Sequence, residues 1–251
     1  MAPQSTADNN PWKLSQENPL HKPPGAFIPR LVMIDSCGGN IRSLDEAFRR
    51  LGVSIIKTSD PHVVATADGL ILPGVGAAQE TMNRLAKAGL VEILRGWDKP
   101  LLGICIGMQI LFSESDEGAH VTDATGSLTP VRLLGKIPGR VTRIEASAGY
   151  PVPHMGWNNL NWESPQGAPH APCPLAEGLD GVSIEHCFYF VHSFRAPDGP
   201  WVVSVTSYNQ KIPAVVQWGQ TFGVQFHPEK SQKSGLQLLR NFVNLCTSSP
   251  Q

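Results

Sequence analysis

Apolar positions follow two different periods along the first half of the chain. Residues 30–35, RLVMID, form a short apolar run typical of a buried strand, and residues 41–51 carry apolar side chains at helical spacing. Asn40 stands in the N-cap position of this predicted helix, and Gly52 stands where helices commonly stop. The pattern therefore begins with a strand that leads into a helix.

The unit of strand and helix then repeats. Further strands are predicted over 54–59, 69–74 and 100–105, and helices over 81–97 and from about Gly107. Strands that alternate with helices predict a largely parallel sheet covered by helices on both faces.

From about Val131 the pattern changes to short β-branched or aromatic segments separated by turn residues, which favours antiparallel strands that extend the sheet. An amphipathic helix is predicted over 235–246. The chain is thus expected to be an α/β protein, with a central, mostly parallel sheet, flanking helices and an antiparallel C-terminal extension. The segments of the extension are 140–145, 187–194, 201–208, 214–219 and 221–228.

Two segments lack periodic apolar residues. Residues 1–29 are rich in Pro, Asn, Ser and Gln, a composition that cannot offset the entropy of ordering, and we expect a flexible extension there. Residues 163–178 are rich in Pro and Gly and are interpreted as a surface loop. We therefore expect residues 30–251 to form the folded domain.

Composition narrows the function classes. The chain has 251 residues and a formal net charge of -1, so its charge indicates neither a nucleic-acid partner nor a membrane surface. Its 5 cysteines are odd in number and scattered, which disfavours a disulfide framework and a structural zinc site. No apolar run approaches the length of a spanning helix. We expect a cytoplasmic protein with free thiols, without a metal or organic cofactor.

One cysteine stands in a distinctive position. Cys105 ends a predicted strand and precedes a predicted helix, with Gly103 and Gly107 two residues away on either side. A nucleophile on a sharp turn between strand and helix needs small neighbours, and the amides that open the helix favour a thiolate. The alternative is a small buried hydrophobic residue, the usual state of a free cysteine in a core. Cys105 alone leaves these two interpretations balanced.

A cysteine nucleophile needs a base, and the segment GVQFHPEKS offers one. His227 ends an apolar run, and Glu229 follows two positions later, across a proline expected to keep the chain extended. In extended chain, residues two apart point the same way, so Glu229 is expected to orient His227. The alternative is a histidine at a strand end beside a solvated acid. The sharp strand-to-helix turn predicted at Cys105, a nucleophile elbow, favours the catalytic interpretation of His227 and Glu229.

Acyl transfer also needs donors for a tetrahedral oxyanion. The amide of Ile106, directly after Cys105, is one candidate. The loop Gly74–Val75–Gly76 is another, because its glycines let the backbone approach a ligand. An ordinary strand-to-helix turn would carry the same glycines.

Five segments together resemble the class I, triad-type glutamine amidotransferases, over roughly residues 31–246. They are PGVGA, GICIGMQIL followed by FSESDEG, PHMGWN, YFVHSF and GVQFHPEKS. They are most similar to the HisH family, the glutaminase subunits of imidazole glycerol phosphate synthase. The resemblance implies a flavodoxin-like fold and hydrolysis of L-glutamine to glutamate and ammonia by Cys105, His227 and Glu229. It also implies glutamine binding by Gln109, Glu117, His192 and Ser193.

The resemblance further implies a partner. HisH-type subunits form a heterodimer with a (β/α)₈ cyclase and pass ammonia to it for histidine biosynthesis. The family usually reads Asp-Tyr-Gly after the first strand, whereas here Ser36 and Cys37 follow Asp35, which leaves a paralogue serving another synthase open. A silent binding module and a free-standing cysteine hydrolase are further alternatives. The residues at partner-facing positions are Asn40, Arg42, Trp157, Asn158 and Lys230.

Overall fold

The computed structural model describes residues 28–35, 41–121, 128–162, 173–179 and 187–248. Nearly all of the predicted N-terminal extension lies outside these ranges, as do Ser36, Cys37 and Asn40.

A sheet of eight strands forms the centre of the molecule, in the order β2-β1-β3-β4-β14-β13-β12-β9. The first five strands are parallel to one another, and the last three continue the sheet antiparallel. The predicted α/β fold with a parallel centre and an antiparallel extension is confirmed, and the order of the parallel strands is that of flavodoxin-like folds. The strands are β1 (Leu31–Ile34), β2 (Ile55–Thr58), β3 (Gly69–Gly74), β4 (Leu101–Cys105), β9 (Asn161–Trp162), β12 (Val202–Tyr208), β13 (Gln210–Trp218) and β14 (Thr221–Val224).

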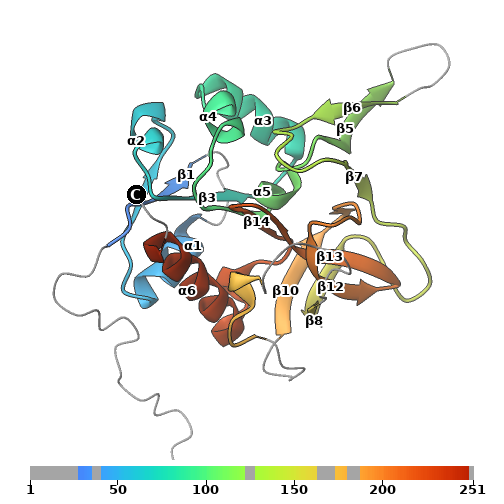
Figure 1. Cartoon of the computed structure of the whole chain (residues 1–251). Coiled ribbons are helices and arrows are strands. Elements are labelled where there is room, and N and C mark those ends of the chain that lie inside the picture. The colour runs from blue at the N-terminus through green and yellow to red at the C-terminus, as the bar shows by residue number, and fades with distance from the viewer. Residues whose placement is uncertain (1–27, 36–40, 122–127, 163–172, 180–186, 249–251) are drawn as a thin grey trace, which may run out of the picture.

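Helices cover both faces of this sheet. Figure 1 shows α1 and α6 below the sheet and α3, α4 and α5 above it. The helix predicted after the first strand is confirmed, and Gly52 follows it with φ 73°. The helices are α1 (Ile41–Arg50), α2 (Pro61–Ala65), α3 (Ala78–Lys87), α4 (Val91–Arg95), α5 (Ile106–Gln109) and α6 (Gln232–Ser248), with 3₁₀ turns η1 (Pro174–Ala176) and η3 (Pro228–Lys230).

Two helix predictions were wrong in extent. The helix expected over 81–97 is two helices, α3 and α4, because Gly89 adopts φ 70° between them and ends the first. The helix expected from about Gly107 is the single turn α5, and the chain then enters a strand at Glu114. The contribution of a helix dipole at Cys105 is correspondingly small.

Part of the predicted antiparallel extension forms separate sheets instead. One pairs β8 (His154–Asn159) with β10 (Cys187–His192), and this places PHMGWN beside YFVHSF with Trp157 opposite Tyr189. The other has the order β11-β7-β5-β6. Apart from that of β5 with β6, which follow each other in the chain, these pairings join segments far apart in sequence, so local patterns do not specify them. The strands of the second sheet are β5 (Glu114–Val121), β6 (Leu128–Arg132), β7 (Arg140–Arg143) and β11 (Phe194–Arg195).

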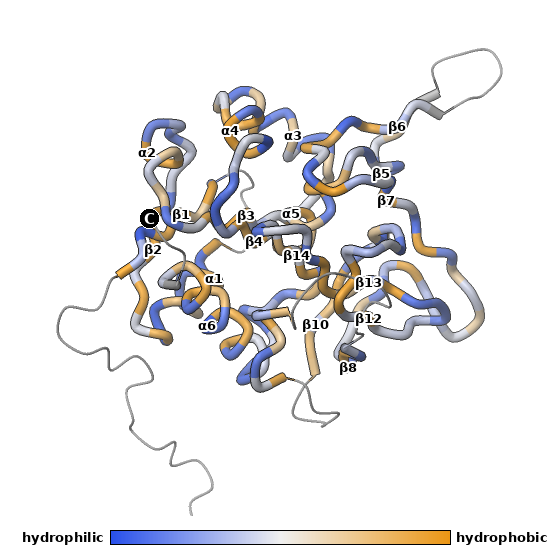
Figure 2. The backbone as a smooth tube through the Cα atoms, in the orientation of Figure 1, coloured by the Kyte–Doolittle hydropathy of each residue, from blue (hydrophilic) through white to orange (hydrophobic). Residues whose placement is uncertain are grey.

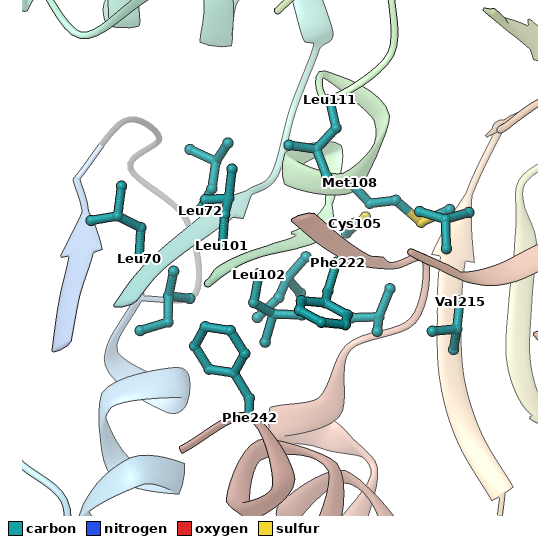
Figure 3. Close-up of a cluster of buried hydrophobic side chains, with 14 of the residues drawn as sticks. Leu70, Leu72, Leu101, Leu102, Cys105, Met108, Leu111, Val215, Phe222 and Phe242 are labelled. Carbon is teal, nitrogen blue, oxygen red and sulfur yellow. The ribbon is translucent and has the colours of Figure 1, made fainter. Parts of the chain in front are cut away.

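The core lies between the central strands and their helices. Figure 2 shows hydrophobic stretches along these strands, and Figure 3 shows side chains of β3, β4, β14 and α6 packed together, with Cys105 and Met108 beside this cluster. The predicted final helix is confirmed, with Phe242 fully buried. Residues 163–172 of the predicted surface loop lie outside the described residues, but Leu175 in η1 is fully buried. No helix of the described residues is long and apolar enough to span a membrane.

Candidate active site

Cys105 occupies a strained turn at the junction of β4 and α5. Its φ is 54° and its ψ is -111°, a backbone conformation that non-glycine residues rarely adopt. A Cβ at Gly103 would lie 2.7 Å from the carbonyl carbon of Gly107, and a Cβ at Gly107 would lie 2.8 Å from that of Leu72. The two glycines are therefore required by the close approach of β3, β4 and α5, and the side chain of Cys105 is directed at a pocket.

His227 lies against Cys105 and is held by Glu229. Its Nδ1 is 2.9 Å from Oε1 of Glu229, and its ring lines the same pocket as the side chain of Cys105. The side chains of His227 and Glu229 are 5% and 3% exposed, so the pair is shielded from bulk water. The structure thus brings Cys105, His227 and Glu229 together in the order nucleophile, base and orienting acid.

The local geometry of this segment differs from the expected one. Pro228 does not keep the chain extended but opens the 3₁₀ turn η3, because its fixed φ suits the first position of such a turn. The amide of Lys230 donates to the carbonyl of His227 across the turn. Glu229 reaches the imidazole through this tight turn.

The pKa of His227 reflects these contacts. Burial lowers it, but the hydrogen bonds to Cys105 and Glu229 and the charges of both groups raise it above its ordinary value. The site therefore favours an imidazolium, the state that protonates a leaving group.

Ser231, which was not among the predicted site residues, fixes the position of His227. Its hydroxyl is fully buried, donates to the carbonyl of His227 at 2.6 Å and accepts from the amide of Tyr189 at 3.0 Å. The amide of His227 donates in turn to the carbonyl of Tyr189. Ser231 therefore ties the histidine segment to β10.

A pocket of about 320 Å³ opens in front of Cys105. It brings together the predicted oxyanion and substrate-binding residues, although Gly74 itself is not among the lining residues but pairs with Cys105 in the sheet register. Pro153, Val191 and Phe194 also line it and were not predicted. The predicted residues that line the pocket are Cys105, His227, Val75, Gly76, Ile106, Gln109, Glu117, His192 and Ser193.

Gln109 is buried at the bottom of the pocket with a fixed orientation. Its Nε2 donates to the carbonyl of Phe194 at 3.1 Å and to Oε1 of Gln225 at 3.0 Å, while its own Oε1 has no hydrogen-bond partner among the described residues. Gln225, also absent from the prediction, is fully buried, and its Nε2 lies 3.8 Å from Sγ of Cys105. Gln109 therefore keeps one unused acceptor, Oε1, which is itself buried.

Glu117 lies on β5 and lines the same pocket. One oxygen accepts from the amide of Ala78 at 2.8 Å and so caps α3, whose N-cap residue makes no side-chain hydrogen bond. Burial raises the pKa of Glu117 above its usual value, and the hydrogen bond from Ala78 opposes this shift. A positive ligand group would stabilise its ionised form.

The predicted partner-facing residues that the structure describes lie on β8, in η3 and on α1. Trp157 is 47% exposed on β8, and its neighbour Met155 is 60% exposed. Asn158 is half-buried and hydrogen-bonds His154, and exposed Lys230 places its ammonium 5.5 Å from the centroid of the Tyr189 ring. Arg42 is exposed on α1 and lines a second pocket with Glu229. Asn40 lies outside the described residues.

A fold with a nucleophile elbow and a Cys-His-Glu cluster at the carboxyl ends of parallel strands defines a class of α/β enzyme with a cysteine nucleophile. Among the described residues, no group of three or more His, Cys, Asp or Glu is placed to hold a metal ion. Comparison with known proteins specifies the family.

The family model of class-I glutamine amidotransferases matches residues 32–246. The imidazole glycerol phosphate synthase subunit HisH of Vibrio cholerae is 40% identical over 215 residues, which cover 86% of this chain and 98% of the relative. The HisH subunit of Shouchella clausii is 41% identical over 221 residues, or 85% and 97% of the two chains.

Solved structures agree in fold. A glutamine amidotransferase from Thermotoga maritima superposes with a TM-score of 0.54 at 16% identity, covering 89% of this chain and 100% of that chain. Another glutamine amidotransferase gives a TM-score of 0.58 at 19% identity, covering 86% and 98%. The chain therefore belongs to the class-I glutamine amidotransferases and, within them, to the HisH family.

Proposed function

We propose that this chain hydrolyses the side-chain amide of L-glutamine through a thioester on Cys105. The observation that carries the proposal is the strained elbow of Cys105 in one pocket with the buried His227–Glu229 pair. The sulfur attacks the amide carbon, and His227 gives its proton to the leaving nitrogen, so that the carbon–nitrogen bond breaks and ammonia departs. His227 then activates a water that cleaves the thioester, which releases glutamate and regenerates the thiol.

The remaining predicted residues are assigned to binding. Oε1 of Gln109 and the carboxylate of Glu117 are acceptors that match the α-ammonium group of glutamine. The amide of Ile106 and a backbone amide of the Gly74–Val75–Gly76 loop are assigned to the oxyanion. Backbone of His192 and Ser193 completes the binding site.

We further propose that the chain is the glutaminase subunit of imidazole glycerol phosphate synthase in the cytoplasm. Its relatives are named as subunits of that enzyme, which supports a partner subunit. The partner is taken to be a (β/α)₈ cyclase in a heterodimer that receives ammonia for histidine biosynthesis. Exposed Met155 and Trp157 on β8, whose first residue is beside the pocket, offer an apolar contact surface for it. Arg42, Asn158, Lys230 and Asn40 are assigned to the same contact.

Activity is expected to depend on this partner. Gly74 packs against Ile106 and Gly107, but Val75 is 39% exposed, and Gly76 adopts φ 97° with open space around it, so the Val75–Gly76 part of the loop is not fixed by packing. We propose that the oxyanion amide turns toward the substrate only when the partner has bound its ligand. The isolated chain then hydrolyses glutamine slowly.

The test is glutamate release by the purified chain, alone and mixed with a cyclase subunit and its ribotide ligand, with Cys105→Ala as control. Hydrolysis that appears only in the mixture and disappears in Cys105→Ala is the expected result. Fast partner-free hydrolysis would contradict the dependence on the partner and favour a free-standing glutaminase. A silent mixture would contradict the histidine assignment and point, with Ser36 and Cys37, to a different synthase.

A further inference from the structure

Two buried histidines outside the proposed triad form a continuous hydrogen-bonded chain with the pocket. His154 on β8 is 1% exposed and His192 on β10 is 6% exposed. Nδ1 of His154 lies 3.0 Å from Nε2 of His192, and Nδ1 of His192 lies 2.8 Å from the carbonyl oxygen of Phe194. At the other end, Nδ2 of Asn158 lies 2.8 Å from Nε2 of His154.

The Phe194 carbonyl fixes which atoms donate and which accept along this series of hydrogen bonds. The carbonyl of Phe194 can only accept, so Nδ1 of His192 donates and Nε2 of a neutral His192 accepts from Nδ1 of His154. Nε2 of His154 then accepts from Asn158. Burial lowers the pKa of His154 to about 4. Burial also lowers the pKa of His192 to about 3, although the hydrogen bond to the Phe194 carbonyl opposes this shift. Both rings are therefore neutral at neutral pH.

The surroundings of the pair are largely aromatic. The ring of His154 stacks on Tyr208 at 4.0 Å and on Phe190 at 4.9 Å between centroids. His227 is the charged group that acts on His192 from the triad side. The pair is thus packed tightly enough to hold a single arrangement.

The Phe194 carbonyl links these histidines to Gln109. The carbonyl of Phe194 accepts from both His192 and Nε2 of Gln109, and the second hydrogen on Nε2 goes to Gln225. Both amide hydrogens of Gln109 are committed, so its Oε1, which is buried and has no partner among the described residues, is the one hydrogen-bonding atom of the amide left for a ligand. If the carbonyl of Phe194 shifted, the amide could rotate and present its NH₂ group instead. An NH₂ group repels an ammonium group, whereas the oxygen accepts from it.

We propose that His154 and His192 are positioning residues that make the pocket selective for substrates with an α-amino group. They hold the Phe194 carbonyl where it keeps Nε2 of Gln109 occupied and leaves Oε1 as the free acceptor of the amide. The inference rests on the proposed function, because it takes glutamine as the substrate, but it concerns residues outside the triad.

The experiment measures binding calorimetrically in a Cys105→Ala background, in which the full chain does not turn glutamine over. The two ligands are L-glutamine and 4-carbamoylbutanoate, which is glutamine without its α-ammonium group. His192→Leu is expected to weaken L-glutamine binding by about tenfold or more and 4-carbamoylbutanoate binding by less than about threefold, since the lost contact involves a charged group. His192→Asn is expected to restore L-glutamine binding to within about threefold, because its amide reaches the position of Nδ1.

His154→Leu is the second variant, should His192→Leu fail to fold. It is expected to weaken L-glutamine binding by about threefold or more without affecting 4-carbamoylbutanoate, because His192 loses the donor that fixes its ring. His62→Leu, at an exposed histidine on α2, is the matched control and is expected to bind both ligands as the parent does.

Equal losses for the two ligands, or no recovery in His192→Asn, would show a merely structural role and overturn the proposal. Unchanged selectivity in both leucine variants would do the same. If the Cys105→Ala parent binds no L-glutamine, the proposed function itself fails. This outcome differs from failure of the present proposal, because the parent still carries both His154 and His192.

Discussion

Gly107 is the position where the elbow tolerates least change. A Cβ there would lie 2.8 Å from the carbonyl carbon of Leu72 and closer still to its oxygen. Leu72 pairs with Gly103 in the register of β3 and β4, so it cannot retreat without moving the sheet. The substitution Gly107→Ala therefore forces backbone, rather than a flexible side chain, to move.

The cost follows from this geometry. Overpacking a rigid site costs about 1–3 kcal/mol, and more where the backbone shifts, so we expect Gly107→Ala to lower the free energy of unfolding by about 3 kcal/mol or more. A displacement of Cys105 by about 1 Å would lower glutaminase turnover by roughly 100-fold. The control is Gly96→Ala at the end of α4, where a Cβ would lie 3.5 Å from the carbonyl oxygen of Glu92, an ordinary contact. Its stability should change by less than about 1 kcal/mol.

Urea unfolding of the two variants, with fluorescence and circular dichroism as probes, separates these expectations. A midpoint for Gly107→Ala equal to that of Gly96→Ala would refute the close packing of β3 against α5. Native stability with lost turnover would place the effect on catalysis alone and contradict the magnitude derived from the overlap.

Three further predictions concern other residues. Glu229→Gln should lower kcat for glutamine by roughly 1000-fold, because the amide no longer stabilises the imidazolium, and wild-type kinetics would contradict this. Because folding lowers the pKa of His154 and His192 from 6.5 to about 4 and 3, the unfolded state binds more protons below pH 6.5. Stability should then fall on acidification by up to about 1.4 kcal/mol per pH unit for each histidine, and a flat urea midpoint from pH 6.5 to 4.5 would refute it. Trp157→Ala should weaken cyclase binding by about 30-fold, while Trp218→Ala, at a comparably exposed tryptophan, should not.

The parts of the site that local patterns specify were predictable. The glycines around Cys105 reflect a crowded turn, and the spacing of His227 and Glu229 allows their contact in either an extended chain or a 3₁₀ turn. The sequence does not distinguish these two backbones, because proline is compatible with both.

The contacts of the supporting residues were not predictable, because they span the chain. Ser231 meets Tyr189 across 42 residues, Gln225 meets Cys105 across 120, and His154 meets His192 across 38. Each depends on strand pairings that nonlocal packing decides. Glu117 illustrates the same limit, since it lies on a strand and caps α3 from 39 residues away.

Detection of the thioester itself tests directly whether Cys105 is the nucleophile. The chain, activated by the cyclase and its ligand, is mixed with L-glutamine, quenched in acid during turnover and analysed by peptide mass spectrometry. We expect one glutamyl group on the peptide that contains Cys105, and none when Cys105→Ser is treated in the same way. A turning-over enzyme without this adduct, or with the adduct on Cys173, Cys187 or Cys246, would contradict the assignment of Cys105 as the nucleophile.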